Sequence, residues 1–366
     1  MEVELLAHTP AHSVSGIGRY TRELYAHLQG RVPVRIVTPI DPPLTRLLSP
    51  LHYFPLGVRG HQPGSILHFT QIMGCSLMLW RPARPAVATV HDLGVLVCPE
   101  DELLFNCFDR WVLDVQLAGL RRMDHYIVHS EQTRNGLISQ LGISPNRIST
   151  VPSSVDTEHF HPIDGAKESI GSKYGIRFDD DVADLLYVGS ELPRKNLITL
   201  LEAIALLGTR GRRLRLLKVG GAGGDQWRMR FLHDIEALGL ENNVEITDVV
   251  PEADLPLFYN VADLCVTPTV LEGGFAWLAM EAMACARPVI ASSGALVPEE
   301  ARSAVLVVRP HEPEALANMI QHCMDDKGLR QRMATRGRQI IESYSWEREA
   351  QAVVQVYHNV MRLAGA

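Results

Sequence analysis

The chain has 366 residues, which is enough for two domains of ordinary size. Its composition, 46% hydrophobic and 21% charged, excludes a disordered protein, and its net charge of −7 gives no indication of nucleic-acid binding. We expect no membrane-spanning helix and no secretory signal, because no apolar run is long enough and the first residues lack a basic and an apolar segment. The six cysteines have no pair spacing, which predicts reduced thiols in a cytosolic protein and no zinc site.

Two glycines follow the first predicted strand. Residues 2–7 are expected to form that strand, and Gly16 and Gly18 lead into a helix that ends near Leu28. A strand–glycine–helix unit can present free backbone N–H groups to a ligand, although a lone Gly-x-Gly is a weak signal. A helix cap without a ligand is the alternative interpretation.

A histidine stands at the end of a later predicted strand. Strands are expected at 34–38, 65–70 and 86–90, and His91 directly follows the last of them. The carboxyl ends of parallel strands are where open α/β sheets bind ligands. Either His91 contacts a ligand, or it caps a loop through hydrogen bonds while Asp92 caps the next helix.

Residues 102–120 are predicted to form a long amphipathic helix. Arg110 lies on it, and Arg121 and Arg122 follow just beyond its end. One interpretation is a surface that contacts lipid. The polar face is not strongly basic, which favours the alternative, a helix packed on the core.

A polar stretch follows the predicted strands at 124–130 and 148–152. Residues 160–181 are expected to be a linker with a short helix, and they end in Asp179, Asp180 and Asp181. Two carboxylates at Asp-x-Asp spacing can hold a divalent cation. These lie in a charged run just before a strand, which predicts a solvated turn and no metal site.

Two adjacent cations follow the next strand. The strand 184–188 ends at Gly189, and Arg194 and Lys195 stand at the start of a helix expected over 197–207. A helix N-terminus carries partial positive charge, so cations are unfavourable there unless an anion offsets them. A diphosphate would do so, with Arg as a bidentate fork and Lys as a point charge.

A glycine pair separates a strand from a helix further along the chain. The strand 264–268 is followed by Gly273 and Gly274, and residues 275–285 are mostly helix formers. Unpaired N–H groups and the helix dipole favour a phosphate at this place. Glu281 lies about two turns into the helix, where it could accept paired hydrogen bonds from the vicinal hydroxyls of a ribose.

The segment 270–293 resembles the signature region of retaining glycosyltransferases of the family 4 type, which have the GT-B fold. It keeps the family's Gly274, Phe275, Glu281–Ala284 and Pro288–Val289. The first family Glu aligns with Gly273, so the nearest carboxylate, Glu272, stands one residue early. The Gly that ends the family's helix is Ala286 here, which costs about 1 kcal/mol if that residue is left-handed.

The resemblance covers nearly the whole chain and implies roles for single residues. Lys195 is implied to bind the donor diphosphate, and Arg194 to supply the charge that the family has at Ser190. Glu281 is implied to bind the ribose, and Glu272 to contact the sugar. The predicted catalytic residues are His91, Lys195 and Glu272, and the predicted donor-binding residues are Gly16, Gly18, Gly189, Ser190, Arg194, Lys195, Val250, Gly273, Gly274, Phe275, Ala276 and Glu281.

The alternation of strands and helices agrees with the architecture that the resemblance implies. This is an α/β fold of the GT-B type, with two doubly wound Rossmann-like domains facing a central cleft. We expect an acceptor-side domain over 1–160, a linker over 161–182 and a nucleotide-sugar domain over 183–345. A last helix over 346–366 is expected to pack back on the first domain.

The implied activity is the retaining transfer of a hexose, with mannose as one candidate, in bacterial surface polysaccharide synthesis. The donor would be a UDP- or GDP-linked sugar and the acceptor a hydroxyl of a glycan or lipid-linked molecule. No metal or other cofactor is expected, and the place is the cytoplasm, with peripheral contact at the inner membrane face left open. Because Glu272 is shifted, a non-catalytic sugar-binding or scaffolding subunit stays an alternative, as does a nucleotide-sugar epimerase.

Overall fold

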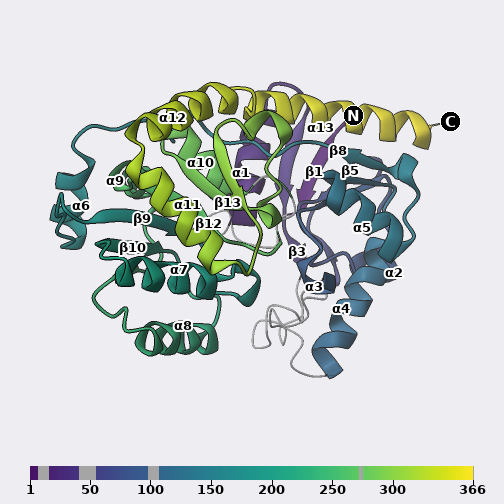
Figure 1. Cartoon of the computed structure of the whole chain (residues 1–366). Coiled ribbons are helices and arrows are strands. Elements are labelled where there is room, and N and C mark those ends of the chain that lie inside the picture. The colour runs from purple at the N-terminus through teal and green to yellow at the C-terminus, as the bar shows by residue number, and fades with distance from the viewer. Residues whose placement is uncertain (7–15, 41–54, 98–106, 272–273, 275, 366) are drawn as a thin grey trace. The chain divides into compact units, whose positions relative to one another are not determined.

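The computed structural model describes residues 1–6, 16–40, 55–97, 107–271, 274 and 276–365. The chain divides into two compact units, one made of Met1–Ser153 with Trp346–Ala366 and the other of Ser154–Ser345. Each unit contains a six-stranded sheet in which all paired strands are parallel. Figure 1 shows the strands and the helices that accompany them.

The first unit has its strands in the order β2-β1-β5-β6-β7-β8. Four of these strands are buried along their whole length, as expected where helices cover both faces of a parallel sheet. The strands are β1 (Val3–Leu6), β2 (Val34–Val37), β5 (Ile66–Phe69), β6 (Ala86–Val90), β7 (His125–Val128) and β8 (Ile148–Thr150). The helices are α1 (Gly16–Leu28), α2 (Leu77–Trp80), α3 (Gly94–Val97), α4 (Cys107–Leu120), α5 (Glu131–Leu141) and α13 (Trp346–Ala364), with the short turn η3 (Pro145–Arg147).

The second unit has its strands in the order β11-β10-β9-β12-β13-β14. The strand order therefore reverses between β9 and β12, which is the topological switch point where open α/β sheets bind ligands. The strands are β9 (Ala183–Val188), β10 (Leu214–Val219), β11 (Val244–Thr247), β12 (Leu264–Thr267), β13 (Val289–Ser292) and β14 (Val305–Val308). The helices are α6 (Ala166–Tyr174), α7 (Leu197–Thr209), α8 (Asp225–Ala237), α9 (Leu255–Val261), α10 (Trp277–Ala284), α11 (Pro313–Asp325) and α12 (Lys327–Ile341), and the short turns are η4 (Pro193–Lys195), η5 (Glu252–Asp254), η6 (Ser293–Ala295) and η7 (Glu299–Ala301).

The structure differs from the sequence prediction in local detail. Gly16 and Gly18 form the first turn of α1 itself, where a loop was expected to precede the helix. A short antiparallel pair, β3 (Pro39–Ile40) with β4 (Gly57–Val58), was not predicted. Two-residue strands carry no periodicity, so the sequence contains no pattern from which to find them. The segment 161–182 belongs to the second compact unit, and the short helix expected in it is α6.

The end of α10 confirms the expectation about Ala286. Its φ of 53° is left-handed, its N–H donates to Met283 O at 3.0 Å, and the Arg287 N–H donates to Ala282 O at 2.8 Å. Helices that end with this backbone arrangement usually have a glycine at the left-handed position. Alanine at this place therefore carries steric strain that a glycine would not have.

We expect Ala286→Gly to raise the free energy of unfolding by about 1 kcal/mol, since it removes that strain. Thermal melting should show a Tm roughly 2–4 °C higher. Ala334→Gly, in the interior of α12, is the matched control and should lower stability by roughly 0.5–1 kcal/mol. Equal effects of the two substitutions would show that the left-handed backbone at Ala286 carries no cost.

Candidate active site

Two segments meet where the strand order of the second sheet reverses. β9 and β12 are neighbours in the sheet, with Cys265 opposite Leu186, and both run to the same edge. After β9 the chain passes through Gly189 and Ser190 into η4, and after β12 it passes into the loop toward Gly274. The two motifs predicted to bind a donor therefore leave the sheet side by side.

Hydrogen bonds join these two segments directly. Arg194 O accepts from the Val270 N–H at 2.7 Å and lies 3.0 Å from Thr269 Oγ1. On the other side of η4, the buried Asn196 donates from Nδ2 to Pro268 O at 3.0 Å. The turn that carries Arg194 and Lys195 is thus attached to the first residues of the glycine loop.

The two cations do not open α7, and this part of the prediction is wrong. Arg194 and Lys195 belong to the separate turn η4, and Asn196, with a φ of 55°, stands between that turn and α7. The left-handed Asn196 turns the chain before the helix begins at Leu197, which the sequence pattern did not reveal. Both cationic side chains are partly exposed at this edge of the sheet.

The glycine loop is described only in part. Glu272, Gly273 and Phe275 lie outside the described residues, and Gly274 is buried. The N–H of Ala276 donates to Ala295 O at 3.2 Å, so this amide is already paired within the protein.

Glu281 lies on α10 and is only 3% exposed. The hydroxyl of Tyr259, a buried residue of α9, donates to Glu281 Oε2 at 2.5 Å. A hydrogen bond to a buried carboxylate fixes its orientation, and this one is charge-assisted. Sequence reasoning did not find Tyr259, because it lies in an apolar helix where an aromatic residue is expected in the core.

Close approach explains two glycines beside the switch point. Gly189 has a φ of +150°, and Gly220, at the end of β10, has a φ of +113°. A Cβ on Gly220 would lie 3.0 Å from Gly189 O, and a Cβ on Gly189 would lie 2.6 Å from the hydroxyl of Tyr187. Glycine at position 220 lets the two loops pass each other, and glycine at position 189 leaves room for the Tyr187 hydroxyl.

Val250, which was predicted to bind the donor, follows β11 and is buried.

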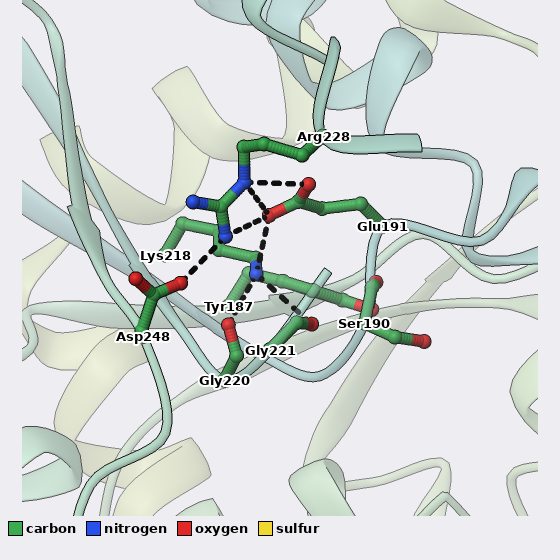
Figure 2. Close-up of polar contacts among 8 residues, drawn as sticks. All are labelled: Tyr187, Ser190, Glu191, Lys218, Gly220, Gly221, Arg228 and Asp248. Carbon is green, nitrogen blue, oxygen red and sulfur yellow. Dashed lines mark hydrogen bonds and ion pairs between the residues drawn. The ribbon is translucent and has the colours of Figure 1, made fainter. Parts of the chain in front are cut away.

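A buried ion cluster lies behind the segment after β9, and the sequence analysis missed it. Figure 2 shows Glu191 between the side chains of Lys218 and Arg228. Lys218 Nζ is 2.6 Å from Glu191 Oε1 and 2.5 Å from Gly220 O, and neither ionic side chain is exposed. Arg228 Nε lies 3.0 and 2.9 Å from the two oxygens of Glu191, and its Nη2 lies 2.7 Å from Asp248 Oδ1.

The charges of this cluster compensate one another. Burial lowers the pKa of Lys218, and the contact with Glu191 acts against that effect. The hydrogen bonds that Arg228 donates to Glu191 raise the pKa of Arg228. The backbone of Glu191 is also held, since its N–H donates to Ala222 O at 2.9 Å. The one sequence signal was a lysine flanked by apolar residues within β10.

His91 in the first unit has partners at both ring nitrogens. Nε2 lies 2.9 Å from Thr70 O, and Nδ1 lies 3.2 Å from Nε2 of His129. Burial lowers the pKa of His91, partly opposed by the contact with Thr70 O. Asp92 accepts a hydrogen bond from the Gly94 N–H at 2.9 Å, so it caps α3 as the alternative interpretation expected.

The Asp-x-Asp segment is engaged with arginine. Asp179 accepts from the Asp181 N–H at 2.9 Å and from Arg213 Nη2 at 2.8 Å, and Asp181 lies 3.7 Å from Arg213. Among the residues that the structure describes, no three His, Cys, Asp or Glu side chains are grouped to hold a metal ion. Within the same described ranges, no helix is long and apolar enough to cross a membrane.

Two family models match successive parts of the chain. Residues 40–159 match the model described as Glycosyltransferase Family 4, and residues 173–340 match the one described as Glycosyl transferases group 1. The chain belongs to the glycosyltransferases of the family 4 type. Its fold is GT-B, with two Rossmann-like parallel sheets, and its enzyme class is glycosyltransferase.

Curated relatives of this glycosyltransferase include enzymes with different acceptors in their names. It is 29% identical over 297 residues to a D-inositol 3-phosphate glycosyltransferase of Corynebacterium glutamicum, covering 77% of this chain and 68% of that one. It is 27% identical over 276 residues to O-antigen chain mannosyltransferase B of Escherichia coli, covering 74% and 70%. It spans 50 to 58% of the length of several other curated relatives.

Solved structures share the fold along the whole chain. Sucrose-phosphate synthase from Thermosynechococcus elongatus superimposes with a TM-score of 0.78 at 24% identity, covering 100% of both chains. Anabaena HepE, solved in complex with UDP-glucose, superimposes with a TM-score of 0.73 at 18% identity, covering 98% of this chain and 100% of that one. At these identities the likeness establishes the fold.

Proposed function

We propose that this glycosyltransferase moves a hexose from a nucleoside diphosphate sugar to a hydroxyl group of a glycan or lipid-linked acceptor, with retention at the anomeric carbon. The bond from that carbon to the diphosphate oxygen breaks, and a bond to the acceptor oxygen forms on the same face. The acceptor proton passes to the departing diphosphate. The observation that carries the proposal is the attachment of the turn with Arg194 and Lys195 to the loop that leads into α10.

Each proposed role follows from chemistry at the switch point. Lys195 and Arg194 balance the charge that develops on the diphosphate, and they do so most strongly when water is excluded. Glu281 accepts hydrogen bonds from the ribose while Tyr259 fixes its orientation. His91 contacts the donor sugar from the first unit, and Glu272 is the proposed second sugar contact.

The finer features of the proposal are supported by the relatives. The Anabaena structure was solved with UDP-glucose, which supports a nucleoside diphosphate sugar as the donor here, and a GDP-linked sugar is kept as the second candidate donor. One relative is named a mannosyltransferase of the O-antigen chain, which supports mannose as the sugar and surface polysaccharide as the product. A membrane-linked acceptor would require peripheral contact with a lipid surface.

The direct test is incubation of the full chain with UDP- and GDP-linked glucose and mannose. Released nucleoside diphosphate, with a glycosylated acceptor or free sugar, is the expected result. An isomerised donor would instead identify an epimerase. Tight binding without any conversion would identify a sugar-binding or scaffolding subunit and overturn the proposal.

We expect activity to withstand removal of divalent metal ions. Arg194 and Lys195 supply the positive charge that a metal supplies in other sites, and Asp179 is already bonded to Arg213. Turnover measured with excess EDTA should equal turnover without it. Loss of activity that added Mg²⁺ or Mn²⁺ restores would show that a metal takes part.

A further inference from the structure

His91 and His129 form a pair whose hydrogen bonds require a definite number of protons. Their four ring nitrogens make three contacts, since His91 Nε2 faces Thr70 O, His129 Nδ1 faces Val151 O at 3.0 Å, and the two remaining nitrogens face each other at 3.2 Å. A carbonyl oxygen only accepts, so each outer contact needs a proton on nitrogen. The inner contact needs one as well.

Two neutral imidazoles carry only two protons between them. In the neutral state, one of the three contacts would therefore bring two lone pairs together without a proton. Unsatisfied polar contacts of buried groups are costly, and the side chain of His129 is only 5% exposed. One additional proton satisfies all three contacts at once.

A buried carboxylate faces the pair from α13. Glu349 Oε1 lies 4.0 Å from His129 Nδ1, and its side chain is 1% exposed. A buried carboxylate favours a positive charge beside it. We propose that His91 and His129 share one extra proton, so that the pair carries a single positive charge opposite Glu349, and that His129 is thereby a positioning residue for His91.

Burial acts against any extra proton, since it lowers the pKa of His91 and lowers that of His129 to about 3, so the proposal depends on the three hydrogen-bond contacts and on Glu349. A charge on His91 lowers the pKa of His129 as well, which opposes a second extra proton. The Asp92 charge and the two carbonyl oxygens act in the opposite direction on the pKa of the pair.

Neighbouring rings from α1, β5 and α13 remain neutral. The ring of Tyr20 lies edge-on to His91 and His129, at centroid distances of 4.6 and 5.5 Å, and burial raises its pKa. His68 bonds to Thr89 Oγ1 and Tyr357 Oη, and burial followed by the charge of His91 lowers the pKa of His68 to about 3. Burial also raises the pKa of Tyr357. Glu349 is thus the buried acidic group that a charge on the pair would face.

The consequence for the reaction rests on the function proposed above, in which His91 contacts the donor. With the extra proton, His91 is held at both nitrogens, so its ring plane and its charge are set before a donor arrives. A donor sugar or its diphosphate would then meet a fixed, positively charged imidazole. Such preorganised charge favours a departing anion.

The first test does not depend on activity. Histidine ¹⁵N spectra of the full chain, assigned with His91→Gln and His129→Gln, should show one imidazolium in the pair at neutral pH. Glu349→Gln removes the facing negative charge, so the pair should lose its proton at a pH lower by about one unit or more. Neutral signatures from both rings in the wild type would overturn the proposal.

The second test measures turnover against pH. His129→Leu should lower kcat about tenfold with little change in KM for the donor, because one hydrogen bond that orients His91 is lost. In the wild type, turnover should fall at alkaline pH as the pair loses its shared proton. His129→Gln keeps an N–H donor but does not titrate, so it should restore part of kcat, and its turnover should no longer fall at alkaline pH. His125→Gln is the matched control, since His125 is a buried histidine of β7, the strand that His129 directly follows, and its Nε2 bonds to Ser149 Oγ. A pH profile in His129→Leu equal to that of the wild type would overturn the positioning role, whereas absence of turnover in the wild type would refute only the proposed function.

Discussion

Lys195→Ala is expected to lower kcat/KM roughly 100- to 1,000-fold, the range seen when one charge-stabilising group is removed from a transition state. Lys195 sits in η4, whose backbone is tied to the loop before α10 through Arg194 O. Its ammonium group would balance the charge on the departing diphosphate. Since its side chain is partly exposed, the substitution removes charge with little loss of packing.

Steady-state kinetics with the donor found by the screen measures this effect. Lys195→Arg should recover part of the lost rate, because it keeps the charge but changes the geometry. Lys327→Ala removes an exposed lysine from the same unit and should leave kcat/KM unchanged. A Lys195→Ala enzyme as active as that control would remove the assignment of the diphosphate site.

Glu281 offers an independent check of the same site. Glu281→Gln keeps the volume of the side chain, and the substitution should mainly raise KM for the donor if the carboxylate binds the ribose. Tyr259→Phe leaves the carboxylate in place but removes the hydrogen bond that orients it. We expect its effect to be smaller than that of Glu281→Gln and in the same direction.

Glu191→Ala is expected to lower the free energy of unfolding of the second unit by about 3–5 kcal/mol, because it leaves a buried ammonium group without its carboxylate. Lys218 is fully buried, and the carbonyls of Gly220 and Gly221 would be its remaining partners in the cluster. Lys218→Met should cost much less, since Glu191 would keep both hydrogen bonds from Arg228. We therefore expect Glu191→Ala to lower the free energy of unfolding much more than Lys218→Met does.

Urea unfolding and hydrogen exchange of the β9 and β10 amides measure these changes. The pH dependence adds a second criterion. The folded-state pKa of Lys218 is below its ordinary value, so the unfolded chain binds more protons in the window between the two values and stability rises with pH there. Removing Glu191 lowers the pKa of Lys218 further and so widens this window, and the stability deficit of Glu191→Ala should therefore shrink as the pH rises toward the ordinary pKa of lysine. A deficit that is equal in Lys218→Met, or independent of pH, would contradict a buried charge as its cause.

Local sequence patterns were sufficient for most of the elements. Strands such as β9 and β12 are mostly apolar, because parallel strands covered on both faces bury most of their residues. The resemblance, and not a local pattern, pointed to Ala286 as the residue that ends α10, and its left-handed backbone was stated only as a condition. The glycines and cations beside the switch point could also be found from the sequence, because they lie in the segments that follow predicted strands in the chain. The short turn η4 escaped prediction because the left-handed Asn196 interrupts what looked like one helix.

The sequence by itself determined which segments are buried and which side chains leave the strand ends, because those properties depend on neighbours along the chain. Only the tertiary structure decided the pairs Glu191 with Lys218, Tyr259 with Glu281, and His91 with His129. Their partners are 22 to 38 residues apart in the chain. Glu191 and Lys218 meet because β9 and β10 are adjacent in one sheet, His91 and His129 because β6 and β7 are adjacent in the other, and Tyr259 and Glu281 because α9 packs against α10. Periodicity predicts that a residue is buried, whereas strand order and helix packing decide which charge or proton it meets there.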